Sequence, residues 1–185
     1  MEAIKTAIEG PLIIEPRVFG DARGYFFESF NAKEFAEKTG LDIIFVQDNE
    51  SKSKYGVIRG LHFQLPPYTQ SKLVRCVNGR VLDVVVDIRK GSPSYGKWVS
   101  CELTEENHRQ FFVPKGFAHG FCVLSDEAVF QYKCDDFYHP EAEGAIAWDD
   151  NGIGIEWPIN LEDVLLSEKD KHHPQLKDFE TPFKY

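Results

Sequence analysis

The sequence predicts a mainly β fold, a sandwich or barrel of short strands with short helices at its flanks. Three observations predict it. Between about residue 43 and residue 158, short runs rich in Val, Ile, Phe and Tyr recur, and these residues favour strands. Close turn signals separate the runs, at Asn78-Gly79, Gly91-Ser92-Pro93 and Pro114-Lys115-Gly116. Helix patterns are confined to the two ends of the chain.

About eight runs have the composition of strands. In chain order they are Ile43–Gln47, Val57–Gln64, Leu73–Val77, Arg80–Ile88, Trp98–Leu103, Gln110–Val113, Ala118–Leu124 and Ala128–Cys134. A helix is predicted over Ala32–Thr39, because Asn31 and Glu34 form a capping box and Gly40 can end the helix. We interpret this helix as cover for the sheet. A second short helical region is predicted over Leu161–Lys171.

The chain of 185 residues fits one domain with its own core. We divide it into an N-terminal arm and helix (1–45), a β body (46–158) and a C-terminal helical segment (159–185). The net charge of −9 argues against nucleic acid or an acidic membrane as partner. No apolar run could span a membrane and no signal peptide is evident, so a cytoplasmic location is expected. The cysteines are expected to be buried reduced thiols: Cys76, Cys101, Cys122 and Cys134.

Strand parity predicts which side chains can meet. A two-residue turn at Asn78-Gly79 would place Val77 opposite Arg80, and pairing outward from there would put Lys72 and Asp83 on one face. Lys72 and Asp83 would then form a diagonal ion pair, although a solvated surface pair is the more common outcome. On this register Val84, Val86 and Ile88 fill the opposite face, interpreted as the core between two sheets.

Arg59 and His62 are three residues apart, so a regular strand would send them to opposite faces. A bulge at Gly60, or a strand that starts after it, would let both reach one site. His62 and Gln64 share a face without such an irregularity. Farther on, His119 alternates with phenylalanines and Tyr132 lies between Phe130 and Cys134. Taken singly, these two are better explained by a satisfied core histidine and a tyrosine whose hydroxyl reaches the surface.

Histidines in a β-barrel first suggest a metal. A metal-binding cupin has His-x-His with a nearby Glu, whereas here Gln64 stands at the second His position and no such carboxylate follows. The pair His172-His173 lies in a charged setting and is interpreted as solvated. No metal site is therefore expected, and no GxSxG or phosphate-binding loop is present. What remains is proton transfer beside a carbonyl, with His62 as base, Lys72 at the developing oxyanion and Tyr132 as acid.

The chain resembles the dTDP-4-dehydrorhamnose 3,5-epimerase family over nearly its whole length. The segments that carry the resemblance are FGDARGYFFESF (19–30), FVQDNESKSKYGVIRGLHFQ (45–64), QSKLVRCVNGRVLDVVVDIRKGSPSYGKW (70–98), FVPKGFAHGF (112–121) and WDDNGIGIEWP (148–158). The resemblance implies a cupin-like jelly roll over residues 46–158 and a metal-free enzyme without a cofactor. That enzyme would epimerise C3 and C5 of dTDP-4-dehydro-6-deoxy-D-glucose, giving dTDP-4-dehydro-L-rhamnose.

The resemblance also implies roles for individual residues. His62 corresponds to the general base, Asp170 to its supporting carboxylate, Tyr132 to the general acid and Lys72 to the enolate-stabilising cation. Asp83 and Gln64 are expected to support this set. The positions that match substrate-contacting residues are Phe19, Arg23, Glu28, Gln47, Asp48, Asn49, Arg59, His119, Glu143 and Lys169. The family is dimeric, so a homodimer is expected, with Phe19, Arg23 and Glu28 reaching the partner subunit's site.

One departure concerns the edge of the nucleotide site, where the resemblance leads us to expect basic residues near Gly144 or Ala147 and neither is basic. Related enzymes that invert a single centre share most of this pattern. The alternatives are therefore a 3-epimerase or a ketoisomerase acting on a related dTDP-4-keto-6-deoxy sugar. A sugar-binding cupin without turnover is a third possibility, but pure binding has no need for a base, an acid and a cation together.

Overall fold

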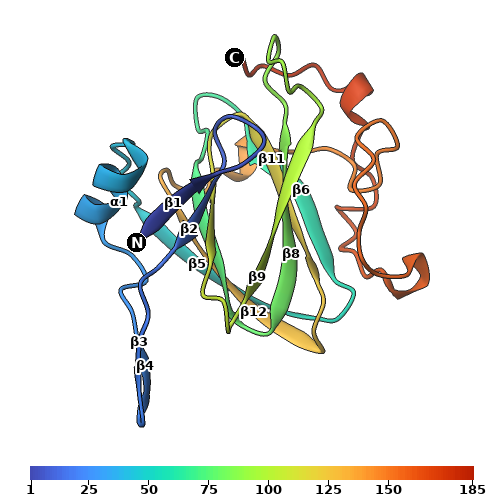
Figure 1. Cartoon of the computed structure of the whole chain (residues 1–185). Coiled ribbons are helices and arrows are strands. Elements are labelled where there is room, and N and C mark those ends of the chain that lie inside the picture. The colour runs from blue at the N-terminus through green and yellow to red at the C-terminus, as the bar shows by residue number, and fades with distance from the viewer.

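The computed structural model describes all 185 residues and consists mainly of two antiparallel sheets that face each other (Figure 1). The first sheet has the order β1 (Glu2–Lys5), β2 (Leu12–Glu15), β10 (Gln110–Val113), β7 (Lys72–Asn78), β12 (Glu127–Cys134) and β5 (Gln47–Lys54). The second has the order β13 (Glu143–Ala145), β6 (Ile58–Gln64), β11 (Phe117–Val123), β8 (Arg80–Asp87) and β9 (Trp98–Thr104). The predicted mainly β sandwich is confirmed.

All the predicted strands but one are found within a few residues of their expected bounds. The exception is Ile43–Gln47, which is wrong because the strand begins at Gln47 and continues to Lys54. This strand is an edge strand, and its pairing with β12 holds it although its sequence QDNESKSK is polar. Ile43 and Phe45 instead pack beneath the helix as irregular chain. The short strands β1, β2 and β13 were not predicted.

The core between the sheets contains side chains from both, among them Val74, Val85, Phe111, Phe121 and Phe130. The prediction that Val84, Val86 and Ile88 lie between the sheets is wrong. They lie on the other face of the second sheet, where the C-terminal segment covers them with Leu176 and Phe183. Both faces of this sheet are buried, so its strands are apolar on both sides and parity alone does not tell the two faces apart.

The predicted hairpin at Asn78-Gly79 is also wrong. Strands β7 and β8 do not pair, because the chain crosses from the first sheet to the second at this turn. Gly79 has a φ of +77°, and a Cβ there would lie 2.1 Å from the carbonyl oxygen of Glu127. The glycine is therefore required for a close crossing rather than for a two-residue hairpin. Lys72 and Asp83 still share the space between the sheets, but they approach it from opposite sides.

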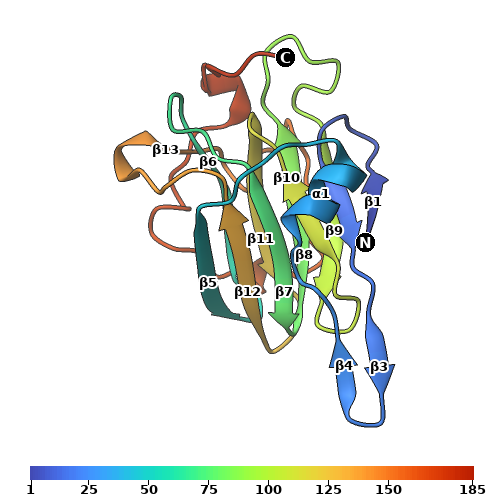
Figure 2. The same cartoon turned by 90° about the vertical axis from the view of Figure 1, so that its left-hand side faces the viewer.

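The helix α1 (Ala32–Thr39) covers the outer face of the first sheet (Figure 2). It begins as predicted, because the Asn31 side chain accepts a hydrogen bond from the Glu34 amide at 3.1 Å, and Gly40 ends it at a φ of +74°. The Glu34 carboxylate binds the amino group of Met1 instead of completing the capping box. The buried ring of Phe35 packs against Phe112, so the helix does serve as cover for the sheet.

Two segments outside the sandwich differ in character. The hairpin of β3 (Phe19–Asp21) and β4 (Gly24–Phe26) projects away from the body (Figures 1 and 2). The predicted helix over Leu161–Lys171 is wrong, since only Leu161–Asp163 forms a 3₁₀ turn. The backbone of Leu165 instead forms hydrogen bonds with Gly56 and Ile58 beside β6. Backbone groups that bond to a neighbouring strand are not available for the hydrogen bonds of a helix.

The remaining short elements are the 3₁₀ turns Pro140–Ala142 and Leu176–Asp178. All four cysteines are buried and unpaired, as predicted. None of the helices has the length and apolar character needed to cross a membrane.

Candidate active site

Two adjoining clefts share His62 and Glu143 in their walls. The first has a volume of about 250 Å³ and is lined by Gln47, Asn49, His62, Phe63, Gln64, Gln70, Lys72, Tyr132, Cys134, Tyr138 and Glu143. The second, of about 370 Å³, is lined by Val57, Ile58, Arg59, His62, Glu143, Leu165, Leu166, Ser167, Lys169 and Asp170. The predicted base, cation and acid thus share the first cleft, and the predicted carboxylate adjoins them.

An irregularity at Gly60 brings Arg59 and His62 to the same side of β6. On the neighbouring strand β11, His119 pairs with His62 and Phe121 pairs with Arg59, with a register shift between them. His119 and Phe121 are two residues apart and face the interior, and paired residues point to the same side. Arg59 and His62, although three apart, therefore both face the cleft. The predicted bulge is confirmed.

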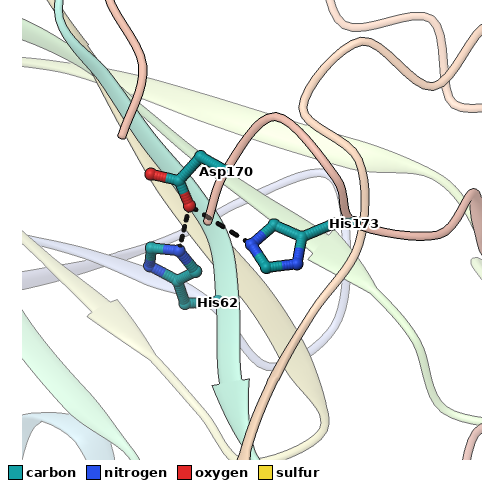
Figure 3. Close-up of side chains that lie close together, drawn as sticks. All are labelled: His62, Asp170 and His173. Atoms are coloured by element: carbon teal, nitrogen blue, oxygen red, sulfur yellow. Dashed lines mark hydrogen bonds and ion pairs between the residues drawn. The ribbon is translucent and has the colours of Figure 1, made fainter. Parts of the chain in front are cut away.

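His62 and Asp170 form a tightly hydrogen-bonded pair (Figure 3). The Nε2 atom of His62 lies 2.5 Å from Oδ1 of Asp170, and the hydroxyl of Ser167 donates to Oδ2 at 2.8 Å. Asp170 is 4% exposed. Burial opposes ionisation of the Asp170 carboxyl, but the hydrogen bonds that it accepts outweigh burial and hold its pKa below the usual value. An ionised carboxylate only accepts, so Nε2 carries the proton and Nδ1 of His62 is left to act as a base.

Lys72 is a half-buried cation on the wall of the same cleft. Its Nζ lies 5.9 Å from the centre of the Tyr132 ring. Burial lowers the pKa of Lys72, and the nearby Cys134, Asp83 and Glu143 partly offset this effect. An ammonium group held in a poorly solvated site interacts strongly with any negative charge that develops beside it.

The predicted ion pair between Lys72 and Asp83 is wrong. Asp83 is fully buried and accepts hydrogen bonds from Nε2 of His119, at 2.9 and 3.0 Å from its two oxygens. The reason is the sheet crossing described above, because β8 pairs with β11 and not with the strand that carries Lys72. His119 is buried against Phe130 and lies behind the cleft wall, next to His62. It is thus a satisfied core histidine in this arrangement, and Asp83 affects Lys72 only through its charge.

Tyr132 extends from β12 into the first cleft. It is partly buried against the core, and burial raises the pKa of its hydroxyl, while the positive charge of Arg59 opposes this. The hydroxyl therefore keeps its proton over a wide pH range and can donate it. Tyr132 comes from the first sheet and His62 from the second, so the two approach the cleft from facing sheets.

The predicted substrate-contacting run on β5 is divided between two faces. Gln47 and Asn49 line the first cleft, where the Gln47 amide donates to Asn49 at 3.0 Å. Asp48 points to the opposite face, where it accepts from Lys133 at 2.9 Å, because successive residues of a strand alternate sides. Asp48 therefore does not line the cleft that Gln47 and Asn49 share.

Gln64 holds the loops at the rim of the first cleft. Its amide nitrogen donates to the carbonyl oxygens of Tyr68 and Phe137, at 2.6 and 3.1 Å, and its oxygen accepts from the His139 amide at 2.7 Å. All its hydrogen-bonding groups are used by the backbone. Gln64 therefore fixes the loops at the rim of the cleft.

Glu143 and Lys169 pair at the rim where the two clefts join. The Nζ atom of Lys169 lies 3.0 Å from Oε2 of Glu143, and the hydroxyl of Tyr138 donates to the same oxygen at 3.3 Å. Burial opposes ionisation of Glu143, but the bond from Lys169 outweighs it and lowers its pKa. Arg59 donates to the hydroxyl of Ser53 at 3.2 Å and lines the second cleft. Although the chain carries a net charge of −9, several cations converge here.

The three predicted N-terminal residues do not line these clefts. Phe19 lies on the projecting hairpin and is 51% exposed. Arg23 pairs with Asp21 at the tip of the hairpin. Glu28 follows the second strand of the hairpin in the chain and is exposed. Nothing in the same chain brings them to His62.

Sequence reasoning missed some residues at the site. The charged sequence around His173 predicts a solvated side chain, but its Nε2 lies 3.3 Å from Oδ1 of Asp170 (Figure 3). Its spacing of three residues from Asp170 was an available signal. Cys134 also lines the first cleft, and its parity with Tyr132 could have predicted this; burial raises its pKa to about 11. Gln70 and Tyr138 come from loops, where parity gives no signal.

Comparison with known proteins shows the family to which the chain is similar. The sequence model of the family described as dTDP-4-dehydrorhamnose 3,5-epimerase matches residues 5–178. A dTDP-4-dehydrorhamnose 3,5-epimerase of Shigella flexneri is 60% identical over 178 residues, which cover 96% of this chain and 97% of the relative.

Solved structures are similar over the same length. The dTDP-4-dehydrorhamnose 3,5-epimerase from Elizabethkingia anophelis has 54% identity and a TM-score of 0.92, covering 96% of this chain and 97% of that one. A dTDP-6-deoxy-D-glucose-3,5-epimerase from Legionella pneumophila, in complex with dTDP-4-keto-L-rhamnose, has 51% identity and a TM-score of 0.93. That match covers 97% of this chain and 94% of the other.

Proposed function

Because this chain belongs to the dTDP-4-dehydrorhamnose 3,5-epimerase family, we propose that His62, Lys72 and Tyr132 carry out its double epimerisation. The enzyme is an isomerase that converts dTDP-4-dehydro-6-deoxy-D-glucose into dTDP-4-dehydro-L-rhamnose. Its sandwich is the cupin-like jelly roll of the family. The single observation that carries the proposed roles is the His62–Asp170 pair in contact with a cleft that also holds a half-buried lysine and a tyrosine.

Proton removal is assigned to His62. The substrate carbons C3 and C5 both flank the C4 ketone, so loss of either proton gives an enolate whose charge lies mainly on O4. The C–H electron pair moves into the enolate and the proton moves to Nδ1 of His62. Asp170 then faces an imidazolium and stabilises it, because its negative charge lies 2.5 Å from Nε2.

Charge stabilisation is assigned to Lys72. Its ammonium group is positioned before the reaction and is poorly solvated. Its electrostatic attraction to the substrate is therefore strongest when the oxyanion forms. Tyr132 then donates its hydroxyl proton to the carbon from the opposite face, which inverts the centre. The resulting phenolate recovers a proton from solvent, and the imidazolium of His62 loses its proton to solvent. Repetition at the second carbon completes the reaction without a net proton change.

The rest of the cleft is assigned to substrate binding. Arg59 and Lys169 are cations near the junction of the two clefts and are suited to the diphosphate. Gln47, Asn49 and Glu143 offer hydrogen bonds beside the sugar. His119 positions its neighbour His62 from behind the wall, with Asp83 holding its ring.

Proton NMR of the purified enzyme with substrate in deuterated buffer tests the function. Deuterium should enter at both C3 and C5. Deuterium at C3 alone would make the protein a 3-epimerase, and a product with a moved carbonyl would make it a ketoisomerase. No label at either carbon would leave only sugar binding and refute the assigned roles.

We also propose a homodimer in which the projecting hairpin of each subunit reaches the partner's cleft. Aromatic residues on this hairpin are largely exposed within one subunit, since Phe19, Tyr25 and Phe26 are 51%, 62% and 65% exposed. Arg23 and Glu28 would then contact the substrate bound to the other subunit. A cytoplasmic location is part of the proposal, and the four free buried cysteines support a reducing compartment.

Mixing two inactive variants tests the exchanged arm. In a heterodimer of His62→Ala and Arg23→Ala subunits, one of the two sites has both residues intact if Arg23 acts across the dimer. The mixture of refolded or co-expressed subunits should then recover turnover, with about half of the wild-type activity per heterodimer. Light scattering should give the mass of two chains. Failure to recover activity in a dimer of proven composition would place Arg23 in its own subunit's site.

A further inference from the structure

A second histidine converges on the carboxylate that supports the base. Nε2 of His62 and Nε2 of His173 lie 2.5 and 3.3 Å from the same oxygen of Asp170 (Figure 3). One ligand atom from each of the three residues lies within 4.8 Å of the others. The rings approach from different elements, β6 and the C-terminal segment, and their planes are nearly perpendicular at 86°. The proposed proton transfer by His62 and Asp170 does not require His173.

Two imidazole nitrogens and one carboxylate oxygen form a common ligand set for Zn²⁺. With bonds of about 2.0–2.2 Å, the ligand atoms of a tetrahedral zinc site lie about 3.4 Å apart. The His173 contact with Asp170 already has this length. The His62 contact would open by about 0.9 Å. Both histidine side chains have room to move, because 32% of the His62 side chain and 21% of the His173 side chain are exposed.

The surroundings favour binding at this place. Asp170 is buried and charged, and the Ser167 hydroxyl holds its second oxygen at 2.8 Å, which orients a carboxylate ligand from behind. The second cleft, with a volume of about 370 Å³, gives access from solvent and leaves room for a water as fourth ligand.

We propose that His62, Asp170 and His173 form a Zn²⁺ site that inhibits the enzyme when it is filled. A zinc ion on Nε2 of His62 requires the other neutral tautomer of the ring, in which the single N–H proton has moved from Nε2 to Nδ1. Nδ1 is the atom assigned to proton removal, so the base is lost while zinc is bound. This site is unlike the His-x-His set of metal-binding cupins, and it supplies nothing to the epimerisation. The metal site depends only on geometry, whereas the inhibition rests on the proposed role of His62.

Calorimetric titration of Zn²⁺ into the full-length enzyme without substrate tests the site. His173→Ala and His173→Gln should each weaken zinc binding by at least about tenfold, because one of three protein ligands is removed. Glutamine retains a hydrogen-bonding group near Asp170, so it separates loss of a ligand from loss of local structure. His172→Ala is the matched control, since His172 is the exposed neighbour and its loss should leave zinc affinity within about twofold.

The inhibition arm measures turnover at increasing Zn²⁺ and its recovery on adding a chelator. The zinc concentration for half inhibition should rise at least about tenfold in both His173 variants and stay unchanged in His172→Ala. Equal zinc affinity in wild type and both His173 variants would overturn the site, as would the absence of binding by the wild type at millimolar zinc. Binding that requires His173 but leaves turnover intact would uphold the site and overturn the base role of His62.

Discussion

Replacing Gly60 with alanine should damage both stability and catalysis, because this residue makes the bulge that aims His62. Gly60 has a φ of +137°, in a region that L-residues rarely adopt. An added Cβ would lie 2.6 Å from Cα of Gly120 and 2.9 Å from the carbonyl oxygen of His119. Both contacts are with backbone of the paired strand β11, so neither can be relieved by turning a side chain.

The size of the effect follows from two costs. An unfavourable backbone conformation costs about 1–3 kcal/mol, and overpacking against fixed atoms costs about 1–3 kcal/mol more. Together they predict a loss of about 2–6 kcal/mol, which lowers Tm by at least about 4 °C in a chain of this length. Relief of the clash would move β6 from β11 and displace His62, and a shift of about 1 Å in a catalytic group can reduce kcat about 100-fold.

Thermal unfolding at equal protein concentration and steady-state kinetics on the purified variant measure these effects. Gly91→Ala is the matched control, because Gly91 also has a positive φ of +88° but no atom lies within 4 Å of its added Cβ. It should show the conformational cost alone, with unchanged turnover. If Gly60→Ala is as stable as Gly91→Ala and retains wild-type kcat, the argument that the close strand approach requires glycine is refuted.

Other predictions concern the assigned roles. His62→Ala should abolish deuterium exchange while nucleotide-sugar affinity stays within about tenfold, or about 1.4 kcal/mol, by calorimetry; a large loss of affinity with retained exchange would contradict the base assignment. Tyr132→Phe should impair inversion more than the first proton removal, compared by NMR of product and of exchanged substrate, and equal loss of both would count against an acid role. Because burial lowers the pKa of Lys72, its charge is lost at a lower pH than that of an ordinary lysine, so activity should fall on the alkaline side. Lys72→Arg, which keeps its charge, should have a lower maximal rate but an alkaline limb at higher pH, and an unmoved limb would exclude Lys72 as its origin.

The sequence by itself determined the β class, most strand positions and the helix with its two caps. These features depend on local alternation, turn residues and capping groups that lie within a few residues of one another. The local sequence also predicted part of the catalytic cleft, because the glycine between Arg59 and His62 indicates a bulge that places both side chains on one side of the strand. The family resemblance then supplied Asp170, which no local pattern connects to His62 from 108 residues away.

Only the tertiary structure decided which strands pair and which side chains form hydrogen bonds with one another. A turn at Asn78-Gly79 fits a hairpin or a crossing between sheets equally well. Because the chain crosses between the sheets here, Asp83 forms its hydrogen bonds with His119 and does not pair with Lys72. The polar strand β5 exists because β12 pairs with it. Asp170 and His173 lie beside His62 because the C-terminal segment bonds next to β6 rather than forming a helix. The physical reason is common to all of these, since hydrogen bonds between distant segments carry no signature in the residues next to either partner.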